Sequence, residues 1–337
     1  MGRKIVQLNL NPVDPIIAQR IFDEIDANLI VANCTTEEEV IEVARDADAI
    51  IRAGGPLNGN VLKMLQKCQI ISCYAIDIDN IDIEVATERG ICVSYAVDAT
   101  TEEVSDHGMA MMLSLARKLP LYDALVKSGL WKDDNKAMVN LGRPLTRTQN
   151  LTVGSIGFGR AAIALARKCQ GFGMRFLAYD PNKPQGFNSK LGVELVPLNQ
   201  VLQESDFLHM NVPLTPGTHH IMGIEEFKKM KPTSYIINCT ARGAIIDETA
   251  LHFALKENLI KGAGLDMLED GPTKRSPLFD LPNVILTPHV GHVSDTSYNE
   301  MEQRVCKEVV SFFQGEWPPI VVNPKVKDKP HFQNMKP

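Results

Sequence analysis

Along the first hundred residues, short apolar runs alternate with longer amphipathic segments. Short apolar runs are typical of buried strands, and amphipathic segments of surface helices. Thr36 with Glu39 fits a capping box at the start of one of these helices. The strands are expected at 5–9, 29–32, 49–53, 70–73 and 91–95, and the helices at 15–25, 36–44, 61–66 and 83–88. This alternation predicts a parallel sheet covered by helices.

A second alternating series follows an amphipathic segment from Glu102 to Lys118, which Pro120 ends or kinks. A polar, irregular stretch covers about 131–150. The strands after it are expected at 151–156, 174–179, 206–212, 234–239, 262–265 and 284–287, with a last helix at 297–313. The chain is therefore predicted to be an α/β protein with two parallel-sheet domains, and its tail a surface strap with a frayed end.

The second series begins with a strand, a glycine turn, a helix and a second strand that closes on Asp180. Gly157 permits a tight turn, Gly159 lets a pyrophosphate approach the backbone, and Ala162 keeps the helix close to the sheet. Asp180 can accept both ribose hydroxyls and would repel a 2′-phosphate, which favours NAD over NADP. A plain tight turn is the alternative for the motif alone. The complete turn reads Gly157, Phe158, Gly159, Arg160, Ala161 and Ala162.

Composition and charge narrow the class of protein. The 337 residues exceed one ordinary domain, and 44% hydrophobic with 23% charged residues is typical of a globular protein. A net charge of −6 gives no basic field for nucleic acid. No apolar run approaches the ~18 residues of a spanning helix, and the N-terminus is too polar for a secretory signal. We therefore expect a cytoplasmic protein without nucleic-acid or membrane partners.

Cysteines and histidines point to no metal site. The seven cysteines are scattered and mostly lie in apolar segments, as reduced structural thiols do. The histidines at 107, 209, 219, 220, 252 and 331 show no metal-ligand spacing.

Three polar residues follow predicted strands of the second series. Arg242 lies just past one strand, and Asp266 and His289 close the next two. Carboxyl ends of parallel strands line the ligand crevice of open α/β sheets. Arg242 could hold a carboxylate with two hydrogen bonds, and His289 could supply a proton. Taken singly, the three could instead be a surface ion-pair partner, a helix cap and a loop histidine.

With these residues in view, the chain resembles the D-2-hydroxyacid dehydrogenase family. The resemblance is carried, in family order, by VGSIGFGRAAIALA, LAYDP, NVPLTPGT, NCTARGAIIDETAL, GAGLDMLE and NVILTPHVG. It implies a flavodoxin-like substrate domain of residues 1–101 and 297–337, with a Rossmann NAD domain of 102–296 inserted. It also implies a homodimer formed through the cofactor domains.

The resemblance assigns roles to individual residues. Arg242 would bind the substrate carboxylate and carbonyl, His289 would transfer the proton, and Asp266 would contact the nicotinamide carboxamide. Further cofactor contacts would come from Thr240 and Ala241 beside the nicotinamide, from Val212, Pro213 and Thr218 beside the adenosine, and from Gly291. The segments ATTEEVSDHGMAMMLSLAR and LFDLPNVILTPH are most similar to the branch that contains the C-terminal-binding proteins, which includes transcriptional corepressors.

One departure concerns the carboxylate that usually pairs with the catalytic histidine. That position is Gly271, and Glu269 and Asp270 could replace the carboxylate only if the loop path shifts. An unpaired histidine holds its proton less tightly than a paired one. We therefore expect keto-acid reduction to peak at lower pH than in relatives with the full pair.

A second departure lies in the expected substrate loop, Ala75, Ile76 and Asp77, where Ala75 and Asp77 stand in place of glycines. An added acid disfavours a small carboxylate ligand by charge repulsion. Two interpretations stay open, since Asp77 and His292 either reshape the substrate pocket or face solvent.

The sequence thus predicts an NAD-dependent oxidoreductase acting on a 2-hydroxy or 2-keto acid, with His289 as acid and base and Arg242 as substrate anchor. The alternative is a catalytically weak NAD(H)-sensing binding protein. Gly271 and the altered substrate loop are the features that favour this alternative.

Overall fold

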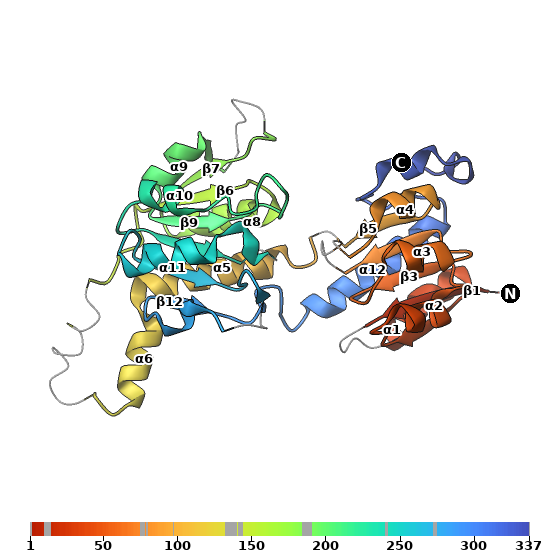
Figure 1. The fold of residues 1–337 in the computed structure, drawn as a ribbon, viewed down its shortest axis with the longest axis horizontal. Helices are drawn as coiled ribbons and strands as arrows, with labels where there is room; N and C mark the ends of the chain where they lie inside the picture. The colour runs from red at the N-terminus through yellow and green to blue at the C-terminus, as the bar shows by residue number, and fades with distance from the viewer. Residues whose placement is uncertain are drawn as a thin grey trace. The chain divides into compact units, whose positions relative to one another are not determined.

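The protein folds into two compact units, each with its own sheet and core (Figure 1). Unit 1 comprises Met1–Thr100 and Ser294–Pro337, and unit 2 comprises Thr101–Val293. The computed structural model describes residues 2–9, 15–74, 78, 80–96, 98–131, 140, 144–183, 191–239, 242–271 and 275–336.

Unit 1 is built on a five-stranded parallel sheet in the order β2-β1-β3-β4-β5. This order is that of flavodoxin-like folds, as predicted. In the register, Val6 of β1 lies beside Ile50 of β3. The strands are β1 (Arg3–Leu8), β2 (Ala27–Ala32), β3 (Ala49–Arg52), β4 (Ile70–Cys73) and β5 (Cys92–Tyr95).

Helices cover both faces of this sheet, so its strands are apolar on both sides. Ile5 and Ile51 face a core with the first and last helices of the unit, and Val6 and Ile50 face the other core. Thr36 and Glu39 form the predicted capping box. The helices are α1 (Pro15–Phe22), α2 (Glu37–Ala44), α3 (Gly59–Met64), α4 (Ile83–Glu88) and α12 (Ser297–Phe313).

The C-terminal tail packs onto unit 1 through two short 3₁₀ helices, Pro324–Asp328 and Pro330–Phe332. Val326 and Phe332 are buried in the core beside α12. Phe332 meets the ring of Trp317 edge to face, with centroids 5.3 Å apart. The predicted frayed end was therefore wrong, because these apolar side chains gain more by burial than the tail loses in freedom.

Unit 2 is built on a seven-stranded parallel sheet in the order β12-β11-β10-β9-β6-β7-β8. The strand order reverses between β6 and β9, which is the switch point of a Rossmann-type sheet. The strands are β6 (Thr152–Ile156), β7 (Arg175–Tyr179), β8 (Glu194–Leu195), β9 (Phe207–Met210), β10 (Tyr235–Asn238), β11 (Gly262–Leu265) and β12 (Val284–Leu286).

Helices also cover both faces of the unit 2 sheet. Met111 and Leu165 belong to the core on one face, and Val201 and Leu251 to the core on the other. α6 differs, because none of its residues is buried, and it extends away from the sheet (Figure 1). The helices are α5 (Thr101–Arg117), α6 (Leu119–Lys127), α8 (Arg160–Gly171), α9 (Leu198–Glu204), α10 (Ile224–Lys229) and α11 (Glu248–Lys256).

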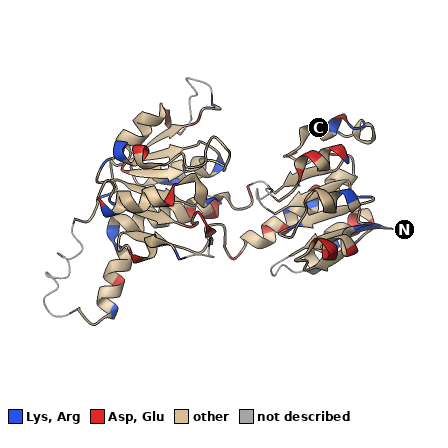
Figure 2. Ribbon diagram, viewed as in Figure 1, with Lys and Arg blue, Asp and Glu red and all other residues tan. Residues whose placement is uncertain are grey.

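Within the described part of the chain, no helix is both long enough and apolar enough to span a membrane. All seven cysteines are buried thiols. Acidic and basic residues are interspersed over both units (Figure 2).

Candidate functional site

The glycine turn after β6 has the geometry that its residues require. Gly157 has φ +91°, and a Cβ on it would lie 2.3 Å from the backbone oxygen of Asn211. Gly159 is the N-cap of α8 and makes no side-chain cap, and a Cβ there would meet nothing within 4 Å. Behind the turn, Ala162 is fully buried against the sheet. The α8 N-terminus therefore faces open space, as a phosphate-binding turn needs.

Asp180 lies beside this turn at the end of β7. Its Oδ2 accepts a hydrogen bond from the N–H of Phe158 at 3.1 Å, and its Oδ1 accepts from the N–H of Asn182 at 2.9 Å. Arg160 is exposed and Ala161 half-buried at the start of α8. A dinucleotide with its pyrophosphate at the α8 N-terminus would bring a ribose to Asp180, so the residues present fit this cofactor.

The loop after β9 borders the other side of the turn. A Cβ on Gly157 would lie 2.9 Å from Cγ1 of Val212, so Val212 packs against the turn. Thr218 closes the loop, because its hydroxyl donates to the carbonyl of Pro213 at 2.6 Å and accepts from the N–H of Thr215 at 2.8 Å. Pro213 is exposed.

Arg242 is half-buried just beyond β10. Its carbonyl accepts a hydrogen bond from the side chain of Asn238 at 3.1 Å. A Cβ on the next residue, Gly243, would lie 2.0 Å from the carbonyl oxygen of Leu268. Only glycine lets this loop touch the loop after β11 so closely. Thr240 and Ala241 lie outside the described residues.

Asp266 is buried just past β11, with an exposed fraction of 1%. Its carboxylate accepts hydrogen bonds from the Thr287 hydroxyl at 2.5 Å, the Val290 N–H at 3.0 Å and the Gly291 N–H at 2.8 Å. The backbone oxygen of Asp266 accepts from the N–H of His289 at 2.9 Å. The carboxylate therefore holds the loop that follows β12, a set of partners that the sequence pattern did not indicate.

His289 is exposed and has φ +55°. A left-handed backbone is uncommon outside glycine and is often found at functional positions. The ring of His292 lies 5.1 Å from the ring of His289, centroid to centroid. Burial, and next the charge of His289, lower the pKa of His292. Of the other expected substrate residues, Ala75, Ile76 and Asp77 lie outside the described part of the chain.

Glu269 binds His220, with its Oε1 2.6 Å from the ring Nε2. Its Oε2 accepts from the N–H of Glu248 at 3.2 Å. Glu269 is thus engaged with groups other than His289, while Asp270 is exposed and Gly271 has φ +67°.

The structure also brings His219 close to His220 and Glu269, with one ligand atom from each residue within 4.8 Å of the others. The spacing of the histidines did not indicate this cluster. Three such atoms could hold a metal ion. Two of these three ligand atoms, Nε2 of His220 and Oε1 of Glu269, already form a direct hydrogen bond with each other.

His107 on α5 makes a further polar contact, which the sequence pattern did not indicate. Its Nε2 lies 2.9 Å from the Thr287 hydroxyl and 3.5 Å from Oδ1 of Asp266. The only signal in the sequence is a histidine in an amphipathic helix, 180 positions before the residue that it contacts.

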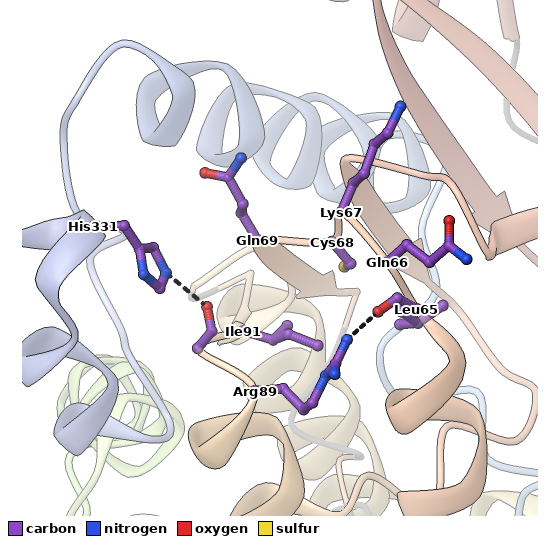
Figure 3. Close-up of a pocket in the computed structure, with 9 residues that line it drawn as sticks. Leu65, Gln66, Lys67, Cys68, Gln69, Arg89, Ile91 and His331 are labelled. Atoms are coloured by element: carbon purple, nitrogen blue, oxygen red, sulfur yellow. Dashed lines mark hydrogen bonds between the residues drawn. The ribbon is translucent and has the colours of Figure 1, made fainter.

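A separate cavity of about 290 Å³ lies in unit 1 and contains none of the predicted site residues (Figure 3). His331 contacts the carbonyl of Gly90 at 3.3 Å, and Arg89 donates to the carbonyl of Leu65. In Figure 3 the side chain of Lys67 points away from Arg89. Because its basic groups do not converge, this cavity offers no cradle for an anion.

The three polar residues come from neighbouring strands of one sheet. Arg242 follows β10, Asp266 follows β11 and His289 follows β12, and these strands lie side by side in parallel. The turn that begins at Gly157 and the loop that begins with Val212 lie at the carboxyl ends of β6 and β9 in the same sheet. The carboxyl ends of the strands in this one sheet therefore carry the glycine turn, the Arg242 guanidinium and the His289 imidazole.

Comparisons with known proteins identify relatives of the whole chain. The family model for the NAD-binding domain of D-isomer specific 2-hydroxyacid dehydrogenases matches residues 109–291. The chain is 39% identical over 293 residues to a glyoxylate reductase from Korarchaeum cryptofilum, covering 86% of this chain and 87% of that protein. It is 37% identical over 308 residues to a D-3-phosphoglycerate dehydrogenase from Methanocaldococcus jannaschii, covering 91% of this chain and 57% of that protein.

A solved structure has a similar fold. The apo form of D-mandelate dehydrogenase from Rhodotorula graminis aligns with a TM-score of 0.82 at 26% identity, covering 93% of this chain and 96% of that one. The chain therefore belongs to the D-isomer-specific 2-hydroxyacid dehydrogenase family, as an NAD-dependent enzyme that acts on the CH–OH group of its substrate.

Proposed function

We propose that this dehydrogenase reduces a small 2-keto acid, with His289 as the proton donor and Arg242 as the anchor of the substrate carboxylate. The observation that carries the proposal is the position of these two residues at the carboxyl ends of β12 and β10, on either side of β11. Several relatives are named glyoxylate reductase, which makes glyoxylate the first substrate to test.

The proposed chemistry uses two protein groups. NADH, when bound, supplies the hydride that adds to the carbonyl carbon. His289 gives its proton to the carbonyl oxygen, which becomes the hydroxyl of the product. The planar fork of Arg242 holds the carboxylate through charge-assisted hydrogen bonds. In the oxidation direction, the neutral imidazole of His289 takes the hydroxyl proton back.

The assignment of Arg242 is tested with one charged and one neutral substrate. We expect Arg242→Gln to raise KM for glyoxylate by roughly 100-fold, since a charge-assisted pair is worth about 3 kcal/mol. Reduction of glyoxylamide, which lacks the carboxylate, should change far less. The Kd for NADH, measured by fluorescence titration, should stay within about twofold of wild type.

Two results would contradict this function. Equal losses of activity on the acid and the amide would remove Arg242 as the carboxylate anchor. Tight NADH binding without turnover on a broad panel of 2-keto acids would favour the cofactor-sensing alternative. Gly271 supports that alternative, because it stands where the carboxylate partner of the catalytic histidine is expected.

We further propose that the enzyme is a homodimer in the cytoplasm. Buried cysteine thiols fit a reducing compartment. α6 and the residues that follow it expose large apolar side chains, at Leu119, Leu121, Val126, Leu130 and Trp131. Such a cluster is typical of a protein contact. Light scattering should give a dimer for wild type and a monomer for Leu130→Glu with Trp131→Glu, and an unchanged mass for the double variant would remove α6 from the contact.

A further inference from the structure

His107 lies under the loop that carries His289. Its Nε2 is 2.9 Å from the Thr287 hydroxyl and 3.5 Å from Oδ1 of Asp266, and its side chain is 21% exposed. α5, which carries His107, packs against β10 and β11. The contact therefore joins a core helix to the loop after β12.

The direction of these hydrogen bonds follows from the available protons. The Asp266 carboxylate receives two backbone N–H groups, from Val290 and Gly291, and the Thr287 hydroxyl lies 2.5 Å from its Oδ1. A carboxylate only accepts hydrogen bonds, so the Thr287 hydroxyl donates its single proton to Asp266. The Thr287 oxygen must then accept from His107, which fixes a proton on Nε2 of His107.

The packing leaves little freedom in this arrangement. A Cβ on Gly291 would lie 2.8 Å from Oδ2 of Asp266 and 3.3 Å from Cδ2 of His107. The imidazole, the carboxylate and the loop backbone thus fill one compact space. The imidazole therefore lies against both Thr287 and the backbone at Gly291.

We propose that His107 is a positioning residue for the reaction, which acts on His289 through Thr287 and Asp266. The inference rests on the proposed role of His289. His289 keeps its left-handed backbone, φ +55°, only if the surrounding loop is held firmly. The Nε2–H of His107 orients the Thr287 hydroxyl, and Thr287 in turn fixes the carboxylate that accepts from the backbone N–H groups of Val290 and Gly291, directly after His289.

The test compares His107→Leu with His107→Gln. The amide of Gln places an N–H near the position of Nε2, whereas Leu fills the space without a donor. We expect kcat for keto-acid reduction to fall roughly 10- to 100-fold in His107→Leu, because small misplacements of a catalytic group have effects of this size. His107→Gln should recover most of the loss. The Kd for NADH should change much less than kcat in both variants.

A second readout separates positioning from a general structural role. A misplaced proton donor makes proton transfer slower, so the solvent deuterium isotope effect on kcat should rise in His107→Leu and return in His107→Gln. Asp106→Asn is the matched control, since the Asp106 carboxylate pairs with Lys168 at 2.9 Å and not with the loop. Its kcat and isotope effect should equal those of wild type.

The outcomes distinguish this inference from the proposed function. Wild-type kcat in His107→Leu, with His289→Asn inactive, would overturn the inference and leave the function standing. An active His289→Asn would overturn the proposed function itself. If His107→Leu fails to fold, Thr287→Val decides, because a wild-type kcat in that variant would also overturn the inference.

Discussion

Replacing Gly159 by Ala should separate cofactor binding from folding. Gly159 has φ −86° and ψ −166°, a conformation that alanine adopts without strain. A Cβ there meets no protein atom within 4 Å, so the folded chain accommodates it. Since alanine also restricts the unfolded chain, we expect the stability of the variant to equal or exceed that of wild type by up to about 1 kcal/mol.

The same methyl group stands in the open space at the α8 N-terminus, where the pyrophosphate would approach. Loss of one charge-assisted hydrogen bond costs about 1.5–3 kcal/mol. The Kd for NADH should therefore rise roughly 10- to 100-fold. Fluorescence titration with NADH measures the Kd, and thermal unfolding measures stability on the same samples.

Two other glycines serve as controls. Gly171→Ala adds a methyl group at the last residue of α8, again with nothing within 4 Å, and should leave NADH binding unchanged. Gly157→Ala should lower the melting temperature, because φ +91° and the Asn211 carbonyl leave no room for a Cβ. NADH binding to Gly159→Ala with wild-type affinity would refute the placement of the pyrophosphate.

Two further predictions follow from single carboxylates. Asp180→Ala should narrow the preference for NADH over NADPH by at least roughly tenfold, because the carboxylate no longer repels a 2′-phosphate; an unchanged ratio of the two Kd values would contradict this role. Glu308 lies on α12, and its carboxyl group accepts from the hydroxyls of Ser72 and Ser94. Burial raises the pKa of Glu308 to about 7, so its contribution to stability is present at low pH and is lost as pH rises through that value. The free energy of unfolding of wild type should therefore fall by about 2 kcal/mol relative to that of Glu308→Gln between pH 5 and pH 8, as measured by chemical denaturation. A difference between the two proteins that does not depend on pH would contradict this assignment.

Local chemistry made much of the fold predictable. The capping box of Thr36 and Glu39 determined where one helix begins, and the periodicity gave α12 its observed ends. The turn from Gly157 to Asp180 could be recognised because its requirements for a tight turn, open space and a strand-end carboxylate fall within one short stretch of sequence.

Contacts between distant segments were harder to foresee. His107 meets Thr287, and Glu269 meets His220, through loops whose paths no local pattern determines. For the same reason, the inward orientation of the Asp266 side chain appeared only in the structure. Phe332 illustrates the same limit, because the polar residues around it concealed an apolar anchor for the tail.

The most direct test of the account is NADH oxidation with glyoxylate by wild type and by His289→Asn, with the Kd for NADH measured for both. We predict many turnovers per active site in wild type, a loss of kcat of at least about 100-fold in the variant, and unchanged NADH binding. Turnover by His289→Asn at the wild-type rate would contradict the account, because the proton would then come from another group.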